Sequence, residues 1–120
     1  MKNFLLFYFF TLLISLNACY YDSEEDLYPS INCVKTNVTY SGVVAAIIQS
    51  KCYACHDAAN NLGNITLEGY TNLKKYVDSG QLLGAIRHES GYSPMPQNLG
   101  QLPACEIAKI EAWVADGAPE

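Results

Sequence analysis

The chain contains two cysteines and a histidine in the pentapeptide Cys52-Tyr53-Ala54-Cys55-His56. Two thiols at this spacing lie about one helical turn apart, so both can bond to the two vinyl groups on one edge of a porphyrin. The adjacent imidazole can then bind the iron from one face of the ring. The spacing therefore predicts covalent attachment of one haem c through Cys52 and Cys55, with His56 as an iron ligand.

Two other kinds of site use a similar pair of cysteines. A thiol–disulfide redox site normally sits in a βαβ scaffold, and no such pattern surrounds this motif. A structural zinc site needs two further ligands at a similar spacing. The candidates are Cys33, His88 and Cys105, which form no second cluster in the sequence. Both alternatives fit the sequence less well than haem.

The second axial position of the iron also needs a ligand. Met95 is the only methionine after residue 18, and it stands between two prolines in the sequence SPMP. Proline fixes its own φ angle and restricts the residue before it, so this loop can present a thioether with little flexibility. We predict Met95 as the second iron ligand. His88 is the competing candidate, but its charged neighbours indicate a solvated side chain.

Helices must position these residues. Helices are predicted at residues 41–51, 72–78 and 81–88, with a last one that starts at Pro103 and stops before Gly117. The apolar residues at helical spacing in the first and last helices are Val44, Ile47, Ile48, Ile107, Ile110 and Val114, with Trp113 beside the last set. No segment alternates convincingly as a strand, so the predicted class is all-α.

The N-terminal segment has the pattern of an export signal. Residues 4–16 form a nearly unbroken apolar run, and Leu16-Asn17-Ala18-Cys19 resembles the lipobox of bacterial lipoproteins. Residues 1–18 are therefore predicted as a lipoprotein signal peptide, Cys19 as the acylated residue, 19–32 as a flexible acidic tether, and 33–120 as the folded domain. An ordinary signal peptide with a chance cysteine is the alternative. The expected location is a bacterial membrane, at the periplasmic face, the outer membrane or the cell surface.

The charge of the chain restricts its partners. Removal of residues 1–18 takes away Lys2, so the formal charge of −5 becomes −6. No basic stripe is present, which argues against nucleic-acid binding. We expect protein redox partners with basic docking patches, contact with a membrane through the lipid anchor, and no small-molecule substrate.

Two cysteines remain after the motif and the lipobox are assigned. Cys33 precedes the first predicted helix and Cys105 lies in the last. An oxidising compartment favours a disulfide between them, which would join the two ends of the domain. Two free thiols are the alternative.

Residues 33–119 together resemble class I cytochrome c domains, particularly short lipoprotein forms of Bacteroidetes. Residues 41–56 match the N-terminal helix that runs into the haem motif, 82–86 and 91–96 match the approach to the ligand loop, and 106–114 with 117–119 match the closing helix. The resemblance implies Cys52 and Cys55 as thioether attachments, His56 as proximal ligand and Met95 as distal ligand. It also implies three to five helices around the haem, with the first and last crossing near it. The Cys33–Cys105 pair is not part of the general class I pattern, and the details of residues 57–66 do not carry over.

The expected function is one-electron transfer without enzymatic activity, because two strong axial ligands leave no vacant iron site. The alternative is a peroxidase-like haem enzyme or a gas or redox sensor, in which a small ligand displaces Met95. A third possible function is that of a structural module in which the haem forms the core.

Overall fold

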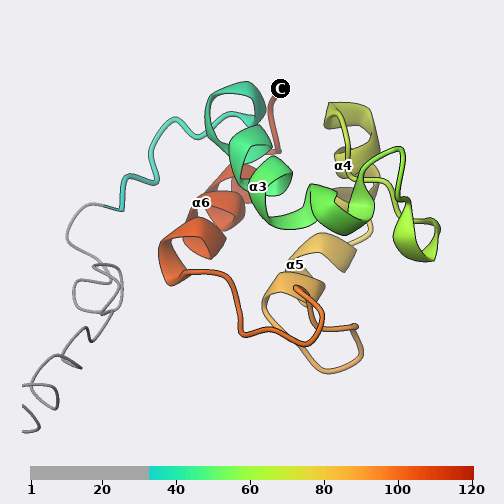
Figure 1. Ribbon diagram of the computed structural model, residues 1–120. Coiled ribbons are helices and arrows are strands. Elements are labelled where there is room, and N and C mark those ends of the chain that lie inside the picture. The colour runs from blue at the N-terminus through green and yellow to red at the C-terminus, as the bar shows by residue number, and fades with distance from the viewer. Residues whose placement is uncertain (1–32) are drawn as a thin grey trace, which may run out of the picture.

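The computed structural model describes residues 33–120, and every regular element within them is helical (Figure 1). The elements are the π-helical turn η1 (Tyr40–Val44), α3 (Ala45–His56), the 3₁₀ turn η2 (Leu62–Asn64), α4 (Tyr70–Asp78), α5 (Gln81–Ile86) and α6 (Ala104–Ala115). The prediction of an all-α chain is confirmed for these residues. The predicted signal peptide, Cys19 and the tether lie outside the described residues. Within 33–120 no helix has the length and apolar character needed to span a membrane.

The first helix is longer than the sequence predicts. Thr39 begins it, because its side-chain oxygen accepts a hydrogen bond from the Gly42 N–H at 3.1 Å. The predicted end at residue 51 is wrong, since α3 continues through the cysteine motif to His56. The motif contains neither glycine nor proline, so nothing in it stops the helix. Asp57 then turns to an extended conformation.

The two short middle helices are confirmed, with shifted ends. α4 begins at Tyr70 rather than residue 72, and Gly80 separates it from α5 in the left-handed region at φ 75°. α5 ends at Ile86 rather than residue 88. The reason is that His88 has a φ of 55°, which a continuing right-handed helix does not allow.

The last helix is also confirmed, but a different set of side chains is buried. Pro103 immediately precedes α6. Ile110 and Trp113 are fully buried, whereas Ile107 and Val114 are only half-buried. Trp113 therefore lies at the centre of the buried face rather than beside it.

The core forms where η1, α3, α4 and α6 meet. Its most buried side chains are Val44, Ile48, Leu73, Ile110 and Trp113. The C-terminal segment covers this core, because Pro119 O accepts hydrogen bonds from the Trp113 indole at 2.7 Å and the Tyr40 N–H at 3.2 Å. Tyr70 adds a hydrogen bond from its hydroxyl to Ala118 O at 2.8 Å.

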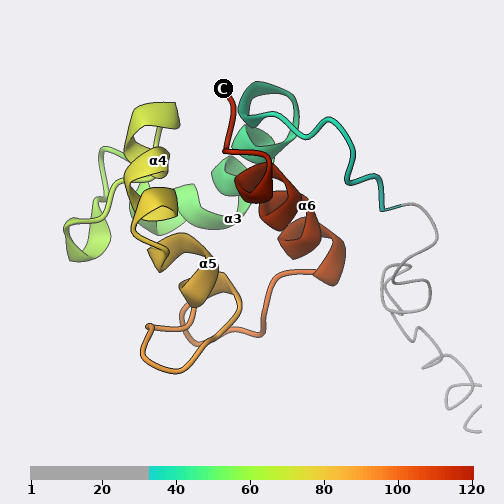
Figure 2. The ribbon, with the colours of Figure 1, turned by 180° about the vertical axis from the view of Figure 1, so that it is seen from behind.

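The elements lie on both sides of α3 (Figures 1 and 2). α6 lies on one side of α3 and α4 on the other, with α5 below them in both views. The segment that joins α5 to α6, residues 87–103, contains Met95 and is called the Met95 loop below. It runs along the side of the molecule opposite the C-terminus.

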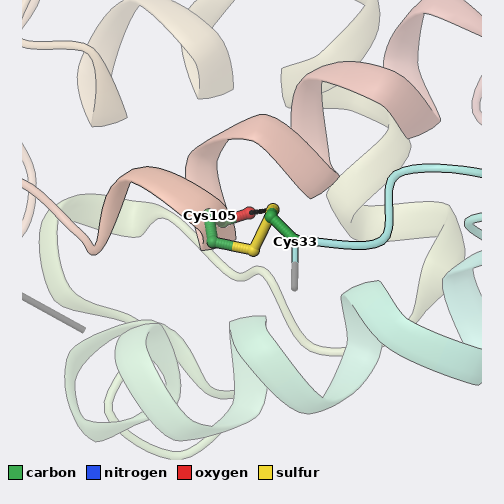
Figure 3. Close-up of a disulfide and its surroundings, with 2 residues drawn as sticks. All are labelled: Cys33 and Cys105. Carbon is green, nitrogen blue, oxygen red and sulfur yellow. Dashed lines mark hydrogen bonds between the residues drawn. A yellow bond between two sulfur atoms is a disulfide. The ribbon is translucent and has the colours of Figure 1, made fainter. Parts of the chain in front are cut away.

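A disulfide joins Cys33 and Cys105 (Figure 3). The pairing expected from the cysteine count is thus present, with a sequence separation of 72 between the two cysteines. It ties the segment before η1 to the first turn of α6, so the start of the described chain is linked covalently to its last helix.

Candidate functional site

The two motif cysteines lie in the last turn of α3. Cys52 is half-buried, Cys55 is exposed, and within residues 33–120 neither takes part in a disulfide. Residues three apart on a helix point to the same side, so the two thiols face one side of α3. Two reduced thiols in this arrangement fit the requirement for bonding to one edge of a porphyrin.

The environment of Cys52 argues against thiol–disulfide exchange. Burial, together with smaller effects of Glu106 and Cys55, raises the pKa of the Cys52 thiol to about 11. Reactive redox cysteines have lowered pKa values and often lie at helix N-termini, whereas this pair lies at the C-terminal end of α3. Cys52 is therefore protonated at neutral pH and is a poor nucleophile for disulfide exchange.

His56 is the last residue of α3, and one of its ring nitrogens is already engaged. Its Nδ1 lies 3.2 Å from Ile65 O. A carbonyl oxygen only accepts hydrogen bonds, so Nδ1 is the donor, and in the neutral imidazole Nε2 is then the nitrogen with the free lone pair. Histidine ligands of metals are typically oriented in this way by a hydrogen bond from the other nitrogen. The half-buried imidazole is thus held in the tautomer that an iron ligand requires.

The segment after α3 provides this carbonyl by folding back over the helix end. Leu67 N donates to His56 O at 2.8 Å, so both the backbone and the ring of His56 bond to the returning segment. Asparagines allow the sharp turns, because Asn61 and Asn64 adopt positive φ angles of 39° and 58°. The sequence analysis missed the role of Ile65, since a backbone carbonyl leaves no signal in the residue type.

Met95 lies in the loop between α5 and α6, half-buried, before a cis peptide bond to Pro96. Its N–H donates to Ala85 O at 3.0 Å. The predicted second ligand therefore comes from a different part of the fold than His56, and its backbone is hydrogen-bonded to α5.

His88 differs from the prediction of a solvated side chain. It is half-buried, and its Nε2 lies 3.0 Å from Met95 O. The two candidates for the second iron position are therefore in direct contact with each other. The prediction relied on the charged neighbours of His88. Those charges pair with one another on the surface, where Arg87 lies 3.2 Å from Glu89 and 2.7 Å from Glu111, and they do not report the position of the His88 ring.

An ion pair near the motif connects the first and last helices. Lys51 Nζ lies 3.4 Å from Glu106 Oε1, and within the described chain Glu106 Oε2 is buried without a hydrogen-bond partner. Glu106 lies within the predicted last helix, but the sequence analysis did not predict this pair. The Glu106 carboxylate is close enough to Cys52 to contribute to the raised pKa of that thiol.

A metal held by protein side chains alone would need several ligands together. Among residues 33–120, no three side chains of histidine, cysteine, aspartate or glutamate form such a group.

Comparisons with protein-family models, curated proteins and solved structures find no match to this chain. The family resemblance described above therefore stays a prediction based on motifs.

Proposed function

We propose that this chain is a lipid-anchored, single-haem class I cytochrome c that transfers one electron at a time. The observation that supports the proposal most strongly is the hydrogen bond between His56 Nδ1 and Ile65 O. It leaves Nε2 free for iron, directly beside two reduced cysteines in the last turn of the same helix. When bound, the haem supplies the iron that alternates between two oxidation states.

The residues of the chain would bind and enclose that group. Cys52 and Cys55 would each form a thioether, and His56 would orient its imidazole through Ile65. Met95 would supply a second, thioether ligand, and His/Met ligation raises the reduction potential relative to stronger donors. The apolar core beside α3 would limit access of water, which reduces rearrangement when the charge changes.

The proposed anchor is Cys19, acylated after removal of residues 1–18. Several acyl methylenes, at about 0.8 kcal/mol each when buried, would hold the protein at a membrane. The acidic tether and domain would favour redox partners with basic docking patches. Metabolic labelling with a fatty acid analogue tests this part, since a Cys19→Ala variant should lose the label.

The absorption spectrum of the purified protein tests the electron-carrier function. Expression of the full chain with a haem-attachment system should give a protein that is reduced and reoxidised reversibly, with the spectrum of a six-coordinate haem in both states. A colourless protein would contradict the proposal.

Removing the methionine ligand has a spectroscopic signature. Met95→Ala should abolish the sulfur-to-iron absorption of the oxidised protein and lower its reduction potential, because a stronger donor or water would replace the thioether. Haem attachment should persist, since Cys52 and Cys55 are unchanged. Retention of the sulfur-to-iron absorption in Met95→Ala would contradict the assignment of Met95.

Carbon monoxide separates the electron carrier from a gas sensor or peroxidase-like enzyme. With His56 and Met95 both bound, the reduced protein should not bind carbon monoxide on mixing, whereas Met95→Ala should bind it. Rapid binding by the wild-type protein would favour the sensor or enzyme. The comparison is made by recording reduced spectra before and after addition of the gas.

A further inference from the structure

His88 and Met95 are joined in a way that fixes the backbone of the proposed iron ligand. The Met95 carbonyl accepts a hydrogen bond from His88 Nε2 at 3.0 Å, because a carbonyl cannot donate. The Met95 N–H donates to Ala85 O at 3.0 Å. The N–H and the carbonyl of Met95 are therefore both hydrogen-bonded, one to Ala85 in α5 and the other to His88, two residues after the end of α5.

We propose that His88 is a positioning residue that holds the Met95 thioether in the direction of the haem iron. This inference rests on the proposed function. A side chain leaves its backbone in a defined direction only when the backbone itself is fixed, and functional groups lose precision when the residues that support them are removed. Without the His88 ring, the Ala85 hydrogen bond would remain, but the Met95 carbonyl would lose its hydrogen-bond partner.

The remaining contacts of the Met95 loop hold it at other points. Gln101 Nε2 donates to Arg87 O at 2.7 Å, which closes the neck of the loop. Tyr92 packs on Gly84 of α5 so closely that an added Cβ at residue 84 would lie 2.5 Å from its ring. These contacts fix the neck and the first half of the loop. The His88 hydrogen bond is made to the ligand residue itself.

The same contact weakens the case for His88 as an iron ligand. Its Nε2 donates the hydrogen bond to Met95 O, so that nitrogen is not available to a metal, and His88 could bind iron only through Nδ1. The rival ligand suggested by the sequence is therefore better explained as the support of the other.

A backbone role is the competing explanation. His88 has a φ of 55°, and histidine, asparagine and aspartate are enriched in the left-handed region. Two variants separate this role from hydrogen bonding. His88→Asn suits the left-handed backbone, but its amide nitrogen is one bond closer to Cα and falls short of Met95 O. His88→Gln places an amide nitrogen the same number of bonds from Cα as Nε2, but suits the backbone less well.

The test uses the full-length, haem-loaded protein and imidazole as an external ligand that displaces Met95. Loss of a neutral hydrogen bond should make His88→Asn bind imidazole about tenfold more tightly than the wild type. The sulfur-to-iron absorption of this variant should also weaken. His88→Gln should recover most of the wild-type resistance and absorption.

Each other outcome overturns the inference at a different point. Wild-type behaviour of His88→Asn, with displacement made easier in His88→Gln, would show that His88 serves the backbone turn. Equal behaviour of all three proteins would show that His88 does not position Met95. A haem-loaded wild type without sulfur-to-iron absorption would refute Met95 as ligand, whereas a wild type without covalent haem would refute the proposed function itself.

Discussion

Replacement of both Cys52 and Cys55 by serine is expected to abolish covalent haem attachment. Serine hydroxyls do not form thioethers with vinyl groups, so the variant should lose its haem completely when denatured. Haem-dependent staining of a denaturing gel measures this directly. The expected effect is complete loss, because the two thiols in the last turn of α3 are the proposed attachment points.

The matched control removes the other pair of cysteines. Cys33→Ala combined with Cys105→Ala should keep the haem bound after denaturation, because these residues form the disulfide and not the thioethers. If haem remains with the Cys52→Ser/Cys55→Ser chain on the gel, the haem is not attached through these two residues.

Loss of the disulfide is expected to have the second large effect, on stability. The bridge closes a loop with a sequence separation of 72 residues. In the chain-entropy model, a closure of this length stabilises the folded state by about 4 kcal/mol. Urea unfolding of the Cys33→Ala/Cys105→Ala variant should show a decrease of this size in the free energy of unfolding. This is a large part of the stability of a small domain.

A chemical control is available because thioethers resist reduction whereas disulfides do not. Wild-type protein treated with a dithiol reductant should lose a similar amount of stability and keep its haem. An unfolding midpoint of the double variant equal to that of the untreated wild type would contradict a stabilising role for the Cys33–Cys105 bridge.

The sequence predicted the helices well where an apolar period or a strong breaker was present. Val44, Ile47 and Ile48 recur at helical spacing and are buried. Gly80 separates α4 from α5, in the gap between the two predicted ranges 72–78 and 81–88. These signals are local, because helix periodicity and glycine conformations depend on neighbouring residues.

The sequence failed where contacts between distant segments decide the structure. The burial of Trp113 depends on η1 and on the carbonyl of Pro119, which neighbouring residues do not reveal. The same holds for Ile65, whose carbonyl orients His56, and for His88, whose ring reaches the carbonyl of Met95. Backbone acceptors are available at every residue, so no residue type marks the ones that are used.

The reactive residues of the candidate site could therefore be predicted from the sequence, whereas the hydrogen bonds that hold them in place could not. Cys52, Cys55 and His56 are recognisable because thioether formation and iron binding need particular atoms at a particular spacing. The supporting contacts need only a carbonyl at the right place, and the fold provides it. The structure adds these supports to the sequence pattern.

The mass of the denatured mature polypeptide tests the central claim most directly. Protein made in cells that attach haem, then unfolded and treated with an alkylating reagent, should keep the mass of one haem. Cys52 and Cys55 should be unmodified by the reagent. A colourless chain in which the reagent modifies both of these thiols would contradict the electron-carrier account.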